Sequence, residues 1–428
     1  MPYKDVPGRL SRLRIKVSHT PGEVALPDGL KTGELALNAA DGILFSRGAG
    51  GTFLTWQAKI ADYWTAYQES VLATIASTSL EDAEYKSMPD VHNGLPPHMY
   101  NELARLQDGR ACVFGYNSAA PDDPQRPTFW DAATDDTTGS EHLTPVASRW
   151  LFATAAAANG KILCPSWRDN NTVSLDTVTG ELTDLGFPPP GQWSHNGTFY
   201  IDPGKNKVAI TPDNGLGEVR VWDSLKNSIS VQSTFNQLGG LRSGVFLPDG
   251  RSFLFRGKAG GSSYRAVIYD PWTREMHYGA ELGNWFDCGC LMPDGRVLLA
   301  PYANPGATSL TPKIYDPVTD TVESAAPMTR PTASDLGNLY GCLLTPSGHY
   351  LMQSSSNNAF NHIYDPEVGI VRTDTDPISS RAHTPIYGND GWIASRRYSS
   401  GELPVAYRAW NGSFTNEVLN SPFFSKWS

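Results

Sequence analysis

The sequence predicts an all-β protein, a seven-bladed β-propeller that is preceded by a small β module and one amphipathic helix. The first observation is a short aspartate-containing phrase that recurs six times at intervals of 45 to 49 residues, with a degenerate seventh copy around Trp410. The second is a polar turn between two apolar runs, upstream of each phrase. Four short strands in about 45 residues are the period of a propeller blade. The six aspartates are Asp131, Asp176, Asp223, Asp270, Asp316 and Asp365.

Each unit is expected to form two β-hairpins. Asp-Gly and Asn-Gly between alternating hydrophobic residues predict hairpins, because glycine adopts the positive φ that the turn requires. In the fifth unit the pattern predicts strands over 288–292, 296–302, 313–316 and 321–324. A two-layer β-sandwich would not explain seven units of one length, so residues 92–428 are expected to form the propeller. The repeat aspartates are interpreted as turn residues that bond their own backbone. The upstream turns contain Gly109, Gly160, Gly250, Gly295, Gly348 and Gly391, whereas the third unit has IDPGKNKVAI instead.

The phrase IYDPVTDTV followed by APMTRPT resembles a kelch repeat, whose blades carry a Tyr-Asp-Pro-x-Thr turn and then a Met-x-x-Arg stretch. The resemblance is good in units four to six and loose elsewhere. The double glycine that kelch blades show at the end of the second strand is absent. The resemblance therefore implies a divergent, kelch-like propeller.

Residues 1–55 are expected to form the small β module, because Pro, Asp-Gly and Gly-Glu separate short runs such as LALN and ILFS. The string from Gly33 to Asn38, followed by Asp41-Gly42 and Leu44-Phe45, resembles the N-terminal module of bacteriophage tail fibres, seen also in major tropism determinant proteins. In that family the module belongs to the trimeric end that faces the virion. The resemblance implies attachment to phage tail or baseplate proteins; the alternative is an ordinary N-terminal cap. The expected attachment residues are Arg9, Arg12, Arg14, Lys16, Glu34, Asn38 and Asp41.

A helical stalk and linker are expected over residues 56–91. Apolar residues at steps of three and four place one stripe on one face of a helix, and such a helix is marginal unless that face is buried. The stripe would form a homotrimer, as the tail-fibre resemblance implies, or it would pack on the flank of the propeller. The following SLEDAEYKSMPDVHNGLPP is interpreted as a linker. The expected oligomerisation residues are Trp56, Ile60, Tyr63, Tyr67, Val71 and Ile75.

The two faces of the propeller are expected to differ. Turns between the first and second and between the third and fourth strands emerge on one face, here called the turn face. The longer and more varied connections emerge on the other, here called the loop face, which is free to carry function. Aromatic rings beside polar side chains suit sugar recognition, although such residues are equally often packing residues. The candidate ligand-binding residues are Trp167, Arg168, Asp169, Trp193, His195, Tyr264, Trp285, Tyr302, Asn304, Asn358, Phe360, Arg381, His383 and Tyr398.

A catalytic function stays open but is not favoured. Cleavage of a polysaccharide would require two carboxylates close together, and Asp169, Asp213, Asp287 and Asp335 lie in or beside the long connections. No nucleotide motif, sialidase Asp box or closely spaced histidine pair is found in the sequence, so no cofactor and no metal are expected. The five cysteines are expected to be buried free thiols.

Composition limits the partners. The net charge of −10 argues against nucleic acid, since backbone binding needs concentrated Lys and Arg. No stretch is long and apolar enough to insert into a membrane, and the first 25 residues lack the apolar core of a secretory signal. We expect a phage receptor-binding protein that is made in the host cytoplasm, assembles into the virion tail and binds a glycan or protein receptor on a bacterial surface. The alternatives are a glycan-degrading tailspike and a cellular kelch-type scaffold.

Overall fold

The structure is a computed structural model, and the backbone divides into two units, Met1–Tyr63 and Trp64–Ser428. In the first unit β1 (Ile15–Ser18) pairs in parallel with β2 (Leu35–Asn38), and β2 pairs antiparallel with β3 (Ile43–Ser46). Strands β2 and β3 coincide with the runs LALN and ILFS. The residues that the structure describes are 15–18, 35–38, 43–46, 54–89, 102–114, 124–147, 155–165, 172–185, 197–211, 218–234, 241–256, 264–271, 273–301, 309–329, 339–354, 360–375, 382–397 and 403–424.

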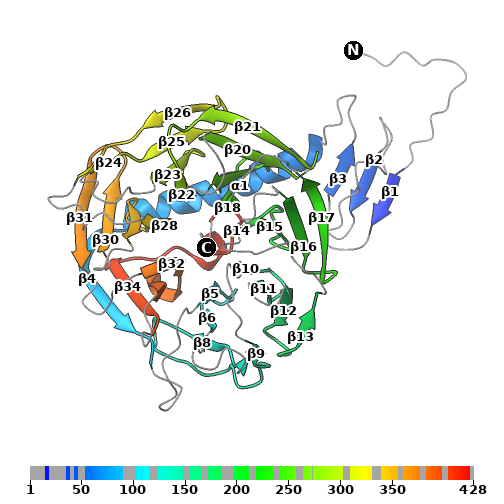
Figure 1. Cartoon of the computed structure of the whole chain (residues 1–428), viewed down its shortest axis with the longest axis horizontal. Coiled ribbons are helices and arrows are strands. Elements are labelled where there is room, and N and C mark those ends of the chain that lie inside the picture. Colours follow the sequence, from blue (N-terminus) through cyan, green and yellow to red (C-terminus); the bar gives the residue numbers. More distant parts are fainter. Residues whose placement is uncertain are drawn as a thin grey trace, which may run out of the picture. The chain divides into compact units, whose positions relative to one another are not determined.

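The second unit contains a seven-bladed β-propeller, as the sequence predicts (Figure 1). The first strand of each blade lies nearest the ring axis. In the fifth blade the third and fourth strands have the predicted bounds. Blades one to three contain β5 (Glu102–Arg105), β6 (Ala111–Phe114) and β8 (Thr128–Trp130); β10 (Ala155–Ala156), β11 (Lys161–Pro165), β12 (Thr172–Asp176) and β13 (Leu182–Asp184); β14 (Gly197–Tyr200), β15 (Lys207–Thr211), β16 (Glu218–Asp223) and β17 (Ser228–Thr234).

Blades four to seven continue the ring in sequence order. Two short pairs accompany the blades: β7 (Pro124–Gln125) with β9 (Val146–Ala147), and β24 (Ser309–Leu310) with β27 (Met328–Thr329). The four blades contain β18 (Leu241–Phe246), β19 (Ser252–Arg256), β20 (Arg265–Asp270) and β21 (Glu275–Glu281); β22 (Phe286–Leu291), β23 (Val297–Pro301), β25 (Lys313–Asp316) and β26 (Thr321–Ser324); β28 (Leu339–Leu344), β29 (Tyr350–Ser354), β30 (Phe360–Asp365) and β31 (Gly369–Thr375); β32 (Ala382–Tyr387), β33 (Ile393–Arg397), β34 (Val405–Trp410) and β4 (Leu80–Ser87).

The repeat aspartates act as turn residues, which confirms their interpretation. The Oδ1 atom of Asp316 accepts hydrogen bonds from the backbone N–H groups of Val318 at 2.8 Å and Thr319 at 3.3 Å. These bonds lower the pKa of the Asp316 carboxyl. Asp176 and Asp365 make the same pair of bonds in their own blades. The conserved position in the repeat is therefore explained by local turn geometry.

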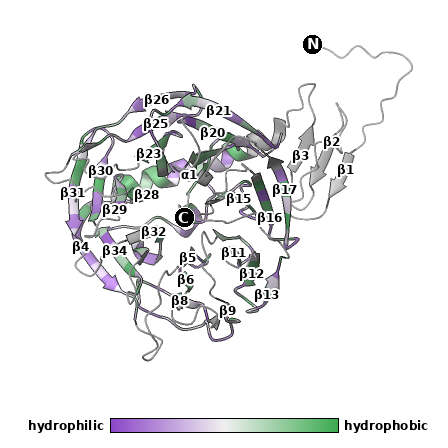
Figure 2. Cartoon of the chain, in the orientation of Figure 1, coloured by the Kyte–Doolittle hydropathy of each residue, from purple (hydrophilic) through white to green (hydrophobic). Residues whose placement is uncertain are grey.

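The residue before the repeat aspartate fills the space between blades. Because side chains alternate along a strand, the position before each aspartate faces the opposite way and points into the sheet-to-sheet core. Trp130, Trp222 and Tyr364 are fully buried there. Inner strands are buried along most of their length, whereas outer strands such as β26 and β31 carry hydrophilic residues (Figure 2). The core of the propeller thus consists of layers of aromatic and aliphatic side chains between neighbouring blades.

The ring is closed by β4, which is the outermost strand of the seventh blade. It pairs antiparallel with β34, from Ser87 opposite Val405 to Leu80 opposite Trp410. The expectation that this segment is a linker is therefore wrong, and the propeller does not begin at residue 92. The polar pattern of LEDAEYKS disguises the strand, because an outer strand needs few apolar residues.

Side-chain and backbone contacts connect β4 to three blades. Lys86 donates to the carbonyl oxygens of Ala132 and Ala133 of the first blade, both at 3.2 Å. The ring of Tyr85 lies 5.2 Å from that of Tyr407 in the seventh blade. Arg372 of the sixth blade donates to the backbone oxygen of Glu81. The first, sixth and seventh blades are thus joined at one strand.

All five cysteines are buried and free, in agreement with the sequence interpretation. The Sγ atoms of Cys290 and Cys342 lie 3.3 Å apart in the fifth and sixth blades, and burial raises the pKa of Cys290. Within the part of the chain that the structure describes, no helix has the length and apolarity that a membrane span requires.

Candidate functional site

The turn face is covered by the chain itself. Helix α1 spans Leu54–Ser77, and its part from Trp64 onward lies on this face. The Nε2 atom of Gln68 donates to the backbone oxygen of Pro293, in the turn between β22 and β23, at 2.7 Å. Ile75 lies against Gly348, in the corresponding turn of the sixth blade. Tyr67 and Val71 are buried in this arrangement. The apolar face of the helix is therefore packed on the propeller of the same chain.

This packing bears on the expected oligomerisation residues. For Tyr67 and Val71 the structure has the intramolecular packing that the sequence left as an alternative. Tyr63 is 46% exposed, and Trp64, which the stripe omitted, takes its place in the contact by packing 5.2 Å from the ring of Phe423. Ile60 is buried, Ile75 is half-buried, and the side chain of Trp56 lies outside the described residues. The homotrimer itself stays a prediction.

The C-terminal segment covers the centre of the same face. Short helix α2 (Asn416–Leu419) is followed by Phe423, whose ring lies 5.5 Å from that of Phe246, and by Phe424, whose ring lies 5.0 Å from that of Tyr387. These aromatic contacts hold the segment across the ring axis. With α1 and this segment in place, the loop face is the face left for a large ligand.

On the loop face the structure brings together two of the predicted binding residues. Tyr264 precedes β20 and Trp285 precedes β22, and their ring centroids lie 5.6 Å apart at an angle of 54°. Both side chains are half-exposed. The backbone N–H of Leu282 donates to the carbonyl oxygen of Tyr264, which fixes the connection between the fourth and fifth blades. Two aromatic rings therefore form one accessible pair.

Polar groups flank the aromatic pair. Asn284 is exposed, and its Oδ1 atom accepts the backbone N–H of Trp285 at 2.8 Å, which orients its amide beside the ring. Arg265 is exposed next to Tyr264, and its Nε atom donates to the carbonyl oxygen of Gly279 at 2.8 Å. The guanidinium of Arg265 itself lies 5.8 Å from the ring of Tyr278 on β21, so the pair offers ring faces for stacking with the amide of Asn284 next to Trp285 in the chain.

The other predicted residues do not join this pair within the described structure. Phe360 is only 7% exposed and its ring lies 5.8 Å from that of His362, so the ring packs within the fold, and its role in ligand binding stays a prediction. Only the backbone is described for His383, Lys16, Asn38 and Asp287. The positions outside the described residues are Trp167, Arg168, Asp169, Trp193, His195, Tyr302, Asn304, Asn358, Arg381 and Tyr398, the carboxylates Asp213 and Asp335, and the attachment residues Arg9, Arg12, Arg14, Glu34 and Asp41.

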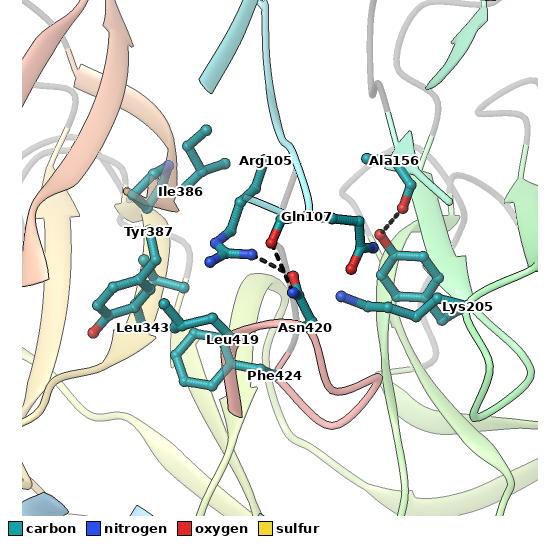
Figure 3. A pocket seen from close by; sticks show the side chains of 12 residues that line it. Arg105, Gln107, Ala156, Lys205, Leu343, Ile386, Tyr387, Leu419, Asn420 and Phe424 are labelled. Carbon is teal, nitrogen blue, oxygen red and sulfur yellow. Dashed lines mark hydrogen bonds between the residues drawn. The ribbon is translucent and has the colours of Figure 1, made fainter. Parts of the chain in front are cut away.

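A second site lies where the ring axis meets the turn face, and sequence reasoning did not find it. It is a pocket of about 480 Å³, open solvent included, beneath the C-terminal segment (Figure 3). Arg105 and Lys205 point into it from opposite sides, with Gln107 and Asn420 between them. The guanidinium of Arg105 donates to Asn420 Oδ1, and Asn420 Nδ2 donates to the carbonyl oxygen of Gln107 at 3.0 Å. Leu343, Ile386 and Phe424 close the apolar part.

Burial perturbs both cations of this pocket. Lys205 is only 8% exposed, and burial, followed by repulsion from Arg105, lowers the pKa of its amine to about 7. Burial likewise lowers the pKa of Arg105 to about 10. The ammonium of Lys205 lies 4.6 Å from the ring centroid of Tyr200, a cation–π contact. Two positive groups therefore share a largely dehydrated space.

The backbone at Lys205 is unusual as well. Its N–H donates to the carbonyl oxygen of Asp202 at 3.2 Å, the same bond that Gly250 makes to Leu247 at 2.9 Å in the next blade. Lys205 thus stands where the other turns have glycine, and it has a φ of 52°. A side chain in this region costs roughly 1 kcal/mol. The phrase IDPGKNKVAI, in which lysine replaces the turn glycine, was the sequence signal that could have located the pocket.

Comparisons with known proteins show the fold alone. No protein-family model and no curated protein sequence matches the chain. Among solved structures, it is similar to a streptogramin B lyase, with a TM-score of 0.55 and 12% identity over 76% of this chain and 98% of that one. It is also similar to a Kuenenia stuttgartiensis hydrazine synthase, with a TM-score of 0.53 and 14% identity over 74% of this chain and 96% of that one. A catalytically inactive virginiamycin B lyase from Staphylococcus aureus, in a structure with quinupristin, gives a TM-score of 0.55 and 8% identity over 76% of this chain and 99% of that one.

Proposed function

We propose that this protein is a receptor-binding tail fibre of a bacteriophage, whose propeller binds a glycan on the host surface through the loop face. The observation that carries the proposal is that the chain covers one face of the propeller and leaves the other accessible. The turn face is occupied by α1 and the C-terminal segment, whereas the loop face presents the half-exposed rings of Tyr264 and Trp285. Such a scaffold holds its binding loops on rigid sheets.

The chemistry of the aromatic pair favours a sugar. A pyranose presents a flat face of C–H groups that stacks on an aromatic ring, while its hydroxyls need hydrogen-bonding groups at the ring edge. Asn284, which precedes Trp285 in the chain, supplies an exposed amide. A protein receptor with an exposed loop would also contact such a surface, and a polysaccharide-cleaving activity would add bond breakage to the same binding mode.

The N-terminal unit supports the viral part of the proposal. Its strands β2 and β3 coincide with the parts of the sequence that resemble the tail-fibre module. In the proposed function this unit attaches to tail or baseplate proteins, the chains assemble as a homotrimer, and the protein is made in the host cytoplasm and assembled into the virion tail. Since α1 packs on the propeller from Trp64 onward, the trimer contact is assigned to the N-terminal unit rather than to Tyr67 and Val71.

The binding experiment uses the purified full-length chain, fluorescently labelled, and host cells or their purified surface polysaccharide. Changing Trp285→Ala is expected to weaken binding by about 2 kcal/mol, or roughly 30-fold, because a central aromatic residue carries much of an interface's energy. Tyr264→Ala should have a similar effect. The matched control is Val318→Ala, which removes a 90% exposed side chain from the turn face. Equal binding by all four proteins would refute the site.

Two further readouts separate the proposal from its alternatives. The mass in solution should be about 140 kDa, three times the 46.6 kDa of one chain. A monomer would favour a cellular scaffold instead. Release of reducing ends from the bound polysaccharide would identify a glycan-degrading tailspike, whereas binding without such release supports a receptor-binding fibre.

A further inference from the structure

The pocket at the ring axis contains a charge without a counter-charge. Among the described residues, Lys205 makes no hydrogen bond or ion pair through its amine, and the residue is only 8% exposed. Acidic groups raise the pKa of a nearby lysine, but in the described part of the chain the charged group that acts on the pKa of Lys205 is Arg105, which lowers it. A cation at a residue with so little exposure is costly unless an anion lies beside it.

The guanidinium of Arg105 also has a hydrogen-bond donor that no described residue accepts. Its two terminal nitrogens donate to Asn420, to Asn416 at 2.6 Å and to the carbonyl oxygen of Leu106 at 3.1 Å, while its Nε atom is buried with no hydrogen-bond partner in the described part of the chain. The guanidinium and the Lys205 ammonium approach the pocket from opposite sides (Figure 3). A group that fits between them must accept hydrogen bonds and carry negative charge.

The backbone provides an independent observation. A turn glycine would serve the third blade as it serves the others, yet this chain keeps a lysine in the left-handed region at that position. Strained residues that persist against an easy alternative point to a function for the side chain. The side chain of Lys205 lines the pocket and points into it.

We infer that the pocket at the ring axis binds one small oxyanion, a carboxylate or a sulfate- or phosphate-like group, between Arg105 and Lys205. Arg105 offers a planar donor and Lys205 a point charge, which together suit an anion with two or three oxygens. The side chain of Asn420 adds an amide from the C-terminal segment. The bound anion would connect the first blade, the third blade and that segment, a role separate from receptor binding on the loop face.

Protonation of Lys205 links this binding to pH. The titratable and charged groups around the amine are Arg105 from β5, Tyr200 from β14 and Asp202 from its own turn. Burial raises the pKa of Asp202 to about 6 and raises that of Tyr200, so between pH 7 and pH 9 Asp202 is charged and Tyr200 neutral. Arg105 stays largely charged in this range. Lys205 is the group that loses its charge there, so the affinity for an anion should fall as the pH rises.

The test is isothermal titration calorimetry of the full-length protein with sodium sulfate, whose charge does not change between pH 7 and pH 9, in a buffer with little other anion. We expect binding at pH 7 that weakens at least tenfold at pH 9, since the fraction of charged lysine falls by more than that. A second titration with glucuronate distinguishes a carboxylate-bearing organic ligand from a free inorganic anion. Binding of either one supports the site, and binding of neither overturns it.

Variants locate the binding. Lys205→Gly keeps the positive φ of the turn and removes the amine, and Lys205→Met removes the charge while keeping the bulk; both should weaken the affinity at least tenfold. Lys226→Met, on an exposed turn of the same blade, is the matched control and should bind like the wild type. Unchanged affinity in both Lys205 variants, with thermal unfolding showing that they are folded, would overturn the inference.

Discussion

Replacing Lys205 with methionine should stabilise the protein at neutral pH when no anion is present. The substitution removes the buried charge and leaves an apolar side chain of similar length among Leu343, Ile386 and Phe424. Most substitutions of buried residues destabilise a protein, so a gain in stability is a specific expectation. The gain is expected because folding removes water from the charged amine, whereas the amine stays hydrated in the unfolded chain.

The size of the gain follows from the pKa of the amine, which falls from 10.5 to about 7 on folding. Each pKa unit corresponds to about 1.36 kcal/mol, so the full shift of 3.5 units is worth about 5 kcal/mol. At pH 7 half of the folded molecules have already released the proton, which leaves a cost of about 4 kcal/mol. Between pH 7 and pH 10.5 the unfolded chain binds more protons than the folded one, so the stability of the wild type rises with pH. Below pH 7 both states are charged, and this group adds no further pH dependence.

The assay is urea unfolding at pH 7 and pH 9, in buffers of low anion content, followed by tryptophan fluorescence. Lys205→Met should be more stable than the wild type by about 4 kcal/mol at pH 7 and by less at pH 9, since the wild type gains about 1.36 kcal/mol per pH unit and the variant does not. Lys226→Met serves as the exposed control. If Lys205→Met matches the wild type at both pH values, the amine is hydrated or paired, and the reasoning fails.

Three further predictions test the packing. Val71→Asp should destabilise the propeller by more than 3 kcal/mol, because it buries an unpaired charge, whereas Leu72→Asp, at a residue that is 49% exposed, should not; urea unfolding measures both. Lys86→Met removes two hydrogen bonds to the first blade and the ion pair with Asp135, and it should cost about 1 kcal/mol in the same assay, while Lys313→Met, which removes a hydrogen bond within its own blade, should cost less. The five buried thiols should resist a thiol reagent in the native protein and react once urea unfolds it; rapid labelling of Cys290 without unfolding would contradict the packing between the fifth and sixth blades.

The repeated blades could be predicted because their signals are local. A turn aspartate, a turn glycine and a bulky residue before the aspartate each have a role that depends on neighbours a few positions away, as Asp316 and Tyr315 illustrate. Strand β4 could not be predicted in this way. Its partner β34 lies more than 300 residues away, and its own sequence alternates too weakly to identify a sheet.

The helix and the pocket show two other limits. Helical periodicity identifies the face that Tyr67 and Val71 share, but not whether that face meets another chain or the propeller. The pocket depends on Arg105 and Lys205, which are 100 residues apart and line one pocket only because the ring brings the first and third blades to the same axis. The sequence predicts Tyr264 and Trp285 as separate ligand-binding candidates, and only the fold shows that their rings lie side by side.

Closure of the ring by β4 has a consequence for synthesis of the protein on the ribosome. The strand emerges before any blade, yet its partner β34 is among the last segments to be made. At about 5–20 residues per second, roughly half a minute passes in which β4 has no strand to pair with. An unpaired edge of apolar residues would invite the wrong neighbour, and charged residues discourage such pairing. The charged residues of β4 therefore suit a strand that stays unpaired until β34 has been synthesised. These residues are Glu81, Asp82, Glu84 and Lys86.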